Sequence, residues 1–235
     1  MNQPLGTGPA PSLPPLIDGE LRLENAAIDR AFRWLLREGR HQPTSGELLQ
    51  GFCRELAEGG FPLMRAFLAK PTLHPQIASI AYRWSRAQPT VEAFTREHDI
   101  WQSDQYLRSP MALIYAGEPM IRRRLFGPDL RLDFPILEDL LAEGATDYAI
   151  FGLRRGDGRP LAVFSIATDA SGGFSDEQFY GFQSLLPLLS LIVEAIETRL
   201  TAKSLLEIYL GADAGRRVMG GLVRRGERVT IAAAI

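Results

Sequence analysis

Apolar residues recur along this chain at two periods, and each change of period marks a boundary between elements. Over residues 21–36 they return every three or four positions, which predicts an amphipathic helix that Gly39 ends in a left-handed conformation. Thr44 and, three residues later, Glu47 fit a capping box that opens a second helix. Residues 21–60 are therefore expected to form an N-terminal helix pair.

After residue 60 the apolar period shortens, which is typical of strands, and prolines separate the apolar runs. We expect antiparallel neighbouring strands over residues 63–68, 77–84 and 91–97, a helix over 110–116, a strand over 119–125 and a helix that Asp133 opens. Two further strands, 148–153 and 161–167, flank a glycine-bearing turn, and this pattern predicts a hairpin.

The last predicted element is a long helix over residues 175–210. Ser175 fits its N-cap, and Gln178 completes a capping box. Its apolar stripe is too broad for a solvent-facing side, so the helix must bury part of its surface. Pro187 lies inside this run and removes one backbone donor, so we expect a kink there.

This order of elements predicts an α+β fold of the GAF/PAS-like kind, an antiparallel sheet flanked by helices, with an N-terminal helix pair and a long C-terminal exit helix. One face of the sheet is expected to be covered by helices and the other to hold a ligand-sized cleft. The expected parts are a flexible leader at 1–20, the helix pair at 21–60, a GAF-like sensor core at 61–174, an exit and dimerisation helix at 175–210, and a connector at 211–235.

Composition and charge exclude several classes of protein. The chain has 235 residues with 26 Lys+Arg against 28 Asp+Glu, so no global positive field recruits nucleic acid or an anionic membrane. The apolar, charge-free stretch over residues 179–193 is interrupted by polar residues and is shorter than the roughly 20 apolar residues of a membrane span. We expect no transmembrane helix. The single cysteine is typical of a reducing, cytoplasmic setting.

Few residues offer metal or nucleophilic chemistry. Cys53 lies on the apolar stripe of the second helix, as a packed hydrophobe does. His74 and His98 lack the spacing of metal ligands, and the chain has no recognisable catalytic grouping, so we expect no metal and no enzyme activity. The arginine runs at 122–124 and 154–155 fit either an anion site or, as is more usual, a solvated surface.

Aromatic residues on or beside the predicted strands are the candidates for contact with a small-molecule effector. They are Tyr82, Trp84, Phe94, Trp101, Tyr148, Phe151 and Phe164. Core packing accounts for most of them equally well, so both interpretations stay open. Because alternate strand residues point to opposite faces, Tyr82 and Trp84 are expected on one side of the sheet and Arg83 on the other.

The segment 205–235 carries a series of short motifs. They are Tyr209, Leu210-Gly211, Asp213-Ala214-Gly215, Arg216-Arg217 and Arg224-Arg225-Gly226-Glu227. On these motifs it resembles the stretch that precedes the catalytic domain in bacterial class III adenylate/guanylate cyclases. The segments 132–135, 143–148 and 173–175 resemble the N-terminal GAF-like regulatory region of the same cyclases.

The resemblance implies that this chain is the regulatory sensor portion of such a cyclase and controls the synthesis of cAMP or cGMP. Residues 230–235 would begin the first catalytic strand, and the family's metal-binding aspartates would follow beyond Ile235. The chain alone is therefore expected to have no cyclase activity and no cofactor, whereas the catalytic domain of the parent would need Mg or Mn.

Because the family works as dimers, the resemblance also implies a homodimer connected through the exit helix. The expected dimer and transducer residues are Leu185, Leu189, Ile192, Ile196, Leu200, Tyr209, Asp213, Arg216 and Arg217. The alternatives are a stripe that packs only on its own sheet and a connector without a switching role. The alternative function is a free-standing GAF-like protein that binds a small molecule and regulates another partner.

Overall fold

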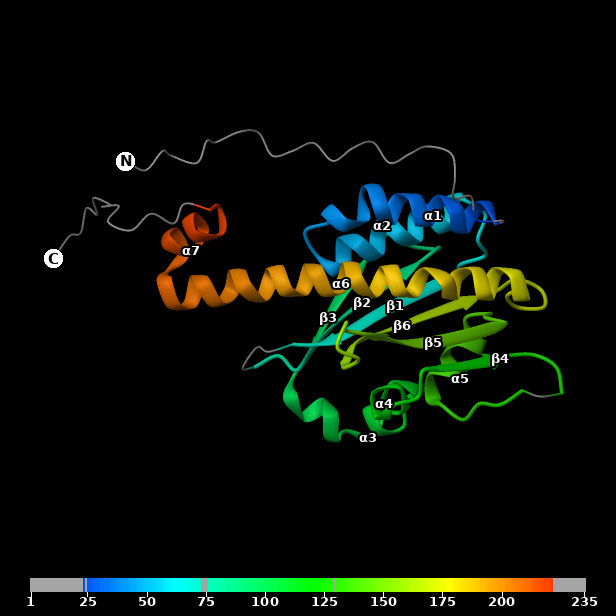
Figure 1. Cartoon of the computed structure of the whole chain (residues 1–235). Helices are drawn as coiled ribbons and strands as arrows, with labels where there is room; N and C mark the ends of the chain where they lie inside the picture. The colour runs from blue at the N-terminus through cyan, green and yellow to red at the C-terminus, as the bar shows by residue number, and fades with distance from the viewer. Residues whose placement is uncertain (1–22, 24, 73–75, 129, 222–235) are drawn as a thin grey trace, which may run out of the picture.

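The computed structural model describes residues 23, 25–72, 76–128 and 130–221, and Figure 1 shows their arrangement. The strands are β1 (Arg65–Pro71), β2 (Ser79–Ser85), β3 (Glu92–Arg96), β4 (Met120–Arg124), β5 (Asp147–Arg154) and β6 (Pro160–Thr168). They form one sheet in the order β3-β2-β1-β6-β5-β4, and every neighbouring pair is antiparallel. The predicted hairpin is the β5–β6 pair.

Helices lie against both faces of this sheet. They are α1 (Ala26–Arg37), α2 (Ser45–Glu58), α3 (Asp104–Leu107), α4 (Pro110–Ala116), α5 (Pro135–Ala142), α6 (Asp176–Leu210) and α7 (Ala212–Met219), with 3-10 turns η1 (Gly39–His41) and η2 (His98–Gln102). In Figure 1, α1, α2 and α6 cover one face, and α3, α4 and α5 lie on the other. The predicted α+β class, an antiparallel sheet flanked by helices with a long C-terminal helix, is confirmed.

Side-chain caps fix the starts of three helices, and two of them, at Thr44 and Ser175, lie where the sequence predicts. The Asn25 side chain accepts hydrogen bonds from the first turn of α1, and Thr44 accepts one from the Glu47 amide. Ser175 and Gln178 form the predicted capping box of α6. The predicted cap of α5 is wrong, because Phe134 occupies the N-cap position and Asp133 instead pairs with Arg123 of β4.

The predicted left-handed end at Gly39 is also wrong. Helix α1 ends at Arg37 with Glu38 as its C-cap, and Gly39 continues with a negative φ into the 3-10 turn. A Cβ at Gly39 would lie 3.1 Å from the Trp34 ring and 3.2 Å from Leu35. Close packing therefore favours a glycine at this position, and backbone conformation does not require one.

The expected kink at Pro187 is absent, since α6 is one continuous helix through this residue and keeps its direction in Figure 1. Pro187 lies on the exposed side of the helix. There water can solvate the carbonyl group that the missing proline donor leaves unpaired, so the chain tolerates proline without a break.

The apolar residues divide into two clusters separated by the sheet. The larger cluster joins α1, α2 and α6 to one face, where Leu68, Trp84 and Phe164 are buried. The smaller cluster lies on the other face under α4 and α5 and includes Tyr148 and Ile150. The alternation of β2 that the sequence predicts is confirmed, because Tyr82 and Trp84 join the larger cluster while Arg83 borders a cavity on the opposite face.

The inner stripe of α6 packs within its own chain, which corrects the expected dimer seam. The side chains of Leu185, Leu189, Ile192 and Ile196 are buried in the larger cluster, and Leu200 packs against its edge. A side chain that already fills its own core cannot also insert between the residues of a second helix. Any dimer contact of α6 must therefore use another face.

Among the described residues, α6 is the one helix long and apolar enough to cross a membrane by length and composition. Its most apolar window has a mean hydropathy of 1.5, and 39% of that window is buried inside the chain. Core helices of globular proteins have the same properties, so this composition is accounted for in part by the sheet that α6 covers.

Candidate functional site

A cavity of about 420 Å³ opens on the face of the sheet opposite α6. Strands β1 and β2 form its floor, where Phe67 and Ala69 lie beside Ala81. The same residues belong to the smaller apolar cluster or pack against it. The volume is within the range of small-molecule sites, and the floor is apolar, as such sites usually are.

Aromatic side chains from the turn η2 and the helices α3 and α4 form a wall of the cavity. The Trp101 ring meets Tyr106 and Tyr115 edge to face, with centroids 4.9 and 6.2 Å apart. The Tyr115 hydroxyl donates to the Ala69 carbonyl at 3.4 Å. Burial raises the pKa of Tyr115 and that of Tyr106, so both phenols stay neutral.

Arginines border the cavity, and their acidic partners lie outside it. Arg65 pairs with Glu143 at 3.2 Å and Arg83 pairs with Glu92 at 2.5 Å, and neither carboxylate lines the cavity. Arg96 of β3 contacts the Thr95 carbonyl at 3.4 Å, and no carboxylate in the described part of the chain pairs with it. The mouth of the cavity therefore carries positive charge.

Three of the seven aromatic candidates line this cavity. They are Phe94, Trp101 and Tyr148. The structure places the other four, Tyr82, Trp84, Phe151 and Phe164, on the opposite face, in or against the larger cluster. For Phe151 and Phe164 the packing partner is Phe182 of α6, at 5.8 Å between ring centroids in each case. Core packing thus accounts for these four.

Several lining residues were missed by the sequence analysis. Ala81 and Arg83 could have been found from alternation along β2, since Tyr82 and Trp84 face the helices. Arg96 follows by the same argument from Phe94 on β3. Tyr115 gives no local signal, because only the packing of α4 on the sheet brings it to the cavity.

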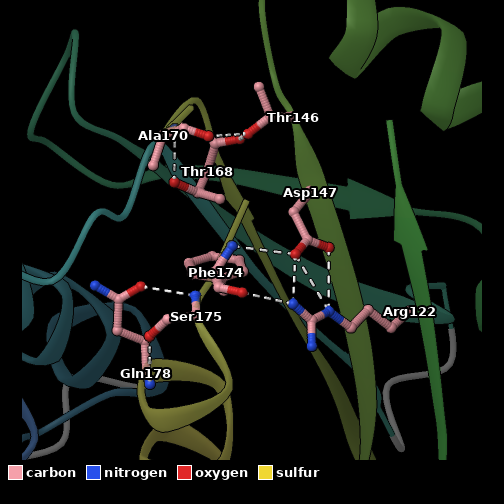
Figure 2. A network of polar contacts seen from close by, with 8 residues as sticks. All are labelled: Arg122, Thr146, Asp147, Thr168, Ala170, Phe174, Ser175 and Gln178. Carbon is pink, nitrogen blue, oxygen red and sulfur yellow. Dashed lines mark hydrogen bonds and ion pairs between the residues drawn. The ribbon is translucent and has the colours of Figure 1, made fainter. Parts of the chain in front are cut away.

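A buried ion pair fastens the start of α6 to the sheet (Figure 2). The Arg122 guanidinium of β4 donates to Asp147 Oδ2 at 2.6 Å and to the Phe174 carbonyl at 2.8 Å, and the Phe174 amide donates to Asp147 at 3.1 Å. Arg122 also lies over the Phe179 ring, 4.0 Å from its centroid. Asp147 is fully buried. Gly173 is required here, because its φ is +78° and a Cβ would lie 2.7 Å from Asp147 Oδ2.

Two of the three upstream segments that resemble the cyclase regulatory region meet at this network, and the third lies on the other face of the sheet. Asp133, in segment 132–135, receives hydrogen bonds from Arg123, which β4 turns to the face opposite Arg122. Segment 143–148 contributes Asp147, and segment 173–175 contributes the Phe174 backbone. Two of the three arginines of run 122–124 are therefore ion-paired within the chain.

A second polar contact joins strand β1 of the sheet to α6. Alternation along β1 turns Lys70 toward the helices, and its ammonium contacts Glu197 Oε2 of α6 at 2.5 Å. The buried Ser45 hydroxyl of α2 donates to the other Glu197 oxygen at 2.7 Å. Burial raises the pKa of Tyr82, and the Glu197 charge adds to this effect. Lys70 also borders the cavity, next to its floor residue Ala69.

The β5–β6 hairpin and η1 hold α6 at neighbouring positions. The Gly156 amide donates to Glu194 at 3.0 Å, and the Arg155 guanidinium lies 3.8 Å from that carboxylate. Arg199 donates to the Gln42 carbonyl at 2.5 Å. Arg154 contacts backbone carbonyls of Gly117 and Gly158. The arginines 154–155 are thus engaged within the chain.

Beyond Arg199 the expected transducer residues lie on a helix end that leaves the sheet. Tyr209 is 80% exposed, and the side chains of Arg216 and Arg217 are exposed on α7. Helix α7 packs back on α6 at Gly215, where a Cβ would lie 3.0 Å from the Glu207 amide nitrogen. The backbone places Asp213 in the first turn of α7.

The described residues contain no group of three His, Cys, Asp or Glu side chains that could hold a metal. His74 lies outside them. Cys53 is fully buried in α2, and burial raises the pKa of its thiol well above the ordinary value. The interpretation of Cys53 as a packed hydrophobe is confirmed.

Comparisons with known proteins find similar folds and no similar sequence. No protein-family model matches the chain, and no curated protein matches it. A GAF domain from A. aeolicus is 13% identical over 72% of this chain and 93% of its own, with a TM-score of 0.45. A GAF domain of a phosphoenolpyruvate-protein phosphotransferase from Coxiella burnetii is 13% identical over 76% and 99%, with a TM-score of 0.49.

A phycoerythrobilin-bound GAF domain from a cyanobacterial phytochrome is 10% identical over 72% of this chain and 96% of its own, with a TM-score of 0.46. Likeness at this level shows nothing about the ligand or activity of this chain. Its own architecture, a six-stranded antiparallel sheet between a helix layer with a long exit helix and a cavity-bearing layer, is the GAF-like fold that the sequence predicts.

Proposed function

We propose that this chain is a sensor domain that binds a small molecule in the cavity and signals through α6. One observation carries the proposal. Strand β1 forms the cavity floor with Ala69 and, at the next residue, holds Glu197 of α6 through Lys70. A ligand that shifts β1 therefore acts on the helix where it leaves the sheet, because a packed strand transmits small displacements to its contacts.

Native mass spectrometry of the freshly purified chain tests this proposal. We expect a retained small molecule in the wild type and its loss in Ala81→Phe, which fills the cavity floor. Ala93→Phe is the matched control, since Ala93 is exposed on the neighbouring strand and does not line the cavity. Thermal unfolding of each variant checks that the fold is intact. A retained molecule that survives Ala81→Phe would place its site elsewhere and overturn the proposal.

We further propose that the domain regulates a class III adenylate or guanylate cyclase from the cytoplasm. The resemblance of segments 132–135, 143–148, 173–175 and 205–235 supports this assignment, as does the contact between segments 143–148 and 173–175 at the start of α6. The parent would then carry an aspartate-bearing catalytic strand after Ile235 and would make cAMP or cGMP with Mg or Mn. The alternative is a free-standing binding protein that regulates another partner.

The sequence of the complete gene and an assay of its product separate these two functions. A cyclase domain after Ile235, with cyclic nucleotide formed from ATP or GTP, supports the first. A stop codon at that point, or an unrelated effector domain, contradicts it and favours the free-standing regulator.

The homodimer in this proposal uses the outer face of α6 in place of the buried inner stripe. An uncharged stripe runs along this outer face, with members three or four residues apart. It consists of Tyr180, Ser184, Pro187, Leu191, Ala195, Thr198, Ala202, Leu205 and Tyr209. Solvent-facing helix sides usually carry charges, so this composition is typical of a contact surface. A helix of 35 residues is about 52 Å long, and a face about 10 Å wide gives roughly 1,000 Å² over two chains. That area is close to the lower limit of a specific interface.

Sedimentation of Leu191→Asp tests the dimer. Leu191 is 61% exposed, so the folded chain tolerates the charge while the interface does not. We expect a dimer in the wild type and a monomer in the variant. Leu113→Asp, the same substitution at an exposed leucine of α4, should remain dimeric. A monomeric wild type, or a dimer unchanged by Leu191→Asp, contradicts this part of the proposal.

A further inference from the structure

We infer that the ligand of the cavity is an organic anion in which a flat aromatic ring carries a carboxylate or a phosphate; this inference rests on the proposed function. The cavity has three parts that select such a molecule. They are a flat floor of small residues, an aromatic wall and a cationic mouth.

The floor is flat because two alanines and the ring of Phe94 occupy one row across three strands. Ala69 of β1 pairs with Ala81 of β2, and Ala81 pairs with Phe94 of β3. Directly paired side chains on one face lie within about 5.5 Å of one another, so two alanine methyl groups and the Phe94 ring form a continuous apolar surface. Larger residues at the two alanine positions would fill the space above the strands. This surface fits the face of an aromatic ring.

The aromatic wall faces this floor and offers few free polar groups. Trp101 and its neighbours Tyr106 and Tyr115 present ring edges and faces to the cavity. The Tyr115 hydroxyl already donates to the Ala69 carbonyl, and Tyr148 is hydrogen-bonded to Ser165. A polar ligand would therefore lose its hydration here without compensation, whereas an aromatic ring gains apolar contact.

Two arginines flank the floor row on opposite sides. Arg83 of β2 is two residues from Ala81 and covers the Phe94 ring from 5.2 Å. Arg96 lies two residues beyond Phe94 on β3 and has no carboxylate partner among the described residues. Against these cations and Arg65, the described lining has one acidic residue, Asp139. A guanidinium binds carboxylate and phosphate oxygens through paired donors, so an anionic group attached to the ring meets Arg96 at the mouth.

Titration with three naphthalene compounds tests the inference. The probes are 2-naphthoate, 2-naphthyl phosphate and the neutral 2-naphthamide, which share one ring system and differ in charge. Binding is measured by calorimetry. It is also followed by fluorescence of Trp101, because Trp34 and Trp84 lie in the cluster on the other face of the sheet. We expect both anions to bind at least about tenfold more tightly than the amide, and the stronger of the two identifies the anionic group.

Two arginine variants assign the charge preference to the mouth. Arg96→Gln should weaken both anions about tenfold and leave the amide unchanged, so that the preference disappears. Arg124→Gln is the matched control, because Arg124 is an exposed strand arginine that does not line the cavity, and it should retain the preference.

The outcomes separate this inference from the proposed function. If the amide binds as tightly as the anions, the cavity is a ligand site but not an anion site, and only the inference is overturned. If no probe binds, the chemical class of the molecule retained in native mass spectrometry decides between the inference and its alternatives. An aromatic acid supports the inference, a neutral molecule overturns it alone, and the absence of any retained molecule overturns both.

Discussion

Replacement of Asp147 by Asn removes the charge at the centre of the network in Figure 2 while it keeps the size of the side chain. Asp147 is fully buried, and the Arg122 side chain is 18% exposed. The variant leaves a buried guanidinium without its counter-ion. It also weakens the hydrogen bond that the Phe174 amide donates at the start of α6.

The structure sets the size of this effect. Removal of one partner of a buried ion pair costs about 3–5 kcal/mol, because the remaining charge stays desolvated. Arg122 retains some contact with water, its bond to the Phe174 carbonyl and its contact with the Phe179 ring. We therefore expect a loss near the lower end of this range, about 3 kcal/mol of unfolding free energy.

The neighbouring residue on β4 provides an internal control. Arg123 pairs with Asp133 at the same distance of 2.6 Å, but Asp133 is 40% exposed. Exposed pairs contribute about 0.2–1 kcal/mol, so Asp133→Asn should cost at most about 1 kcal/mol. Both variants remove one negative charge next to an arginine on the same strand, and they differ in burial.

Urea unfolding, followed by circular dichroism and analysed by linear extrapolation, measures both free energies. The expected result is a large decrease for Asp147→Asn and a small one for Asp133→Asn, with equal slopes. Equal losses in the two variants would show that burial does not set the strength of these pairs. A loss under about 1 kcal/mol for Asp147→Asn would show that the network does not stabilise the fold.

Three further predictions follow from the same structure. Leu189→Asp should unfold the chain, since Leu189 is buried in the core and a buried uncompensated charge costs several kcal/mol; a folded monomer in sedimentation would contradict its placement. Cys53 should react with a thiol reagent only after denaturant is added, because burial keeps its pKa high and excludes the reagent; rapid labelling in buffer would show that α2 opens. The hydrogen bond from Arg123 lowers the pKa of Asp133, so the contribution of that pair is present above the ordinary aspartate pKa of about 4 and is lost as the pH falls through the lowered value. The stability difference between wild type and Asp133→Asn should therefore shrink as the pH falls below about 4, and a difference that stays constant down to the acid unfolding transition would contradict this assignment.

The sequence predicts the elements well where local rules are sufficient. The N-cap at Thr44 and the capping box at Ser175 lie at the starts of α2 and α6, and the alternation of β2 correctly separates Arg83 from Tyr82. These features depend on residues close in sequence, so their chemistry is visible in a short window. The predicted left-handed end at Gly39 failed because the chain continues there into a 3-10 turn with a negative φ.

The candidate site divides in the same way. The sequence identified aromatic residues on strands, but an aromatic side chain serves equally well in a core and in a cavity wall, and only the side of the sheet decides. The fold placed Phe94 and Tyr148 at the cavity and Phe151 and Phe164 beneath α6. Likewise, the apolar stripe of α6 covers the sheet, since its side chains are buried in the larger cluster.

By itself, then, the sequence determined the α+β class, the order of most helices and strands and the apolar stripe of α6, because periodicity and capping are local properties of the chain. The tertiary structure alone decided that Lys70 meets Glu197, that Asp147 holds Arg122 and the Phe174 backbone, and that Arg96 stands without a carboxylate among the described residues. These contacts join residues distant in the sequence, and their strength depends on burial and geometry, which arise only when the sheet and its two helix layers come together.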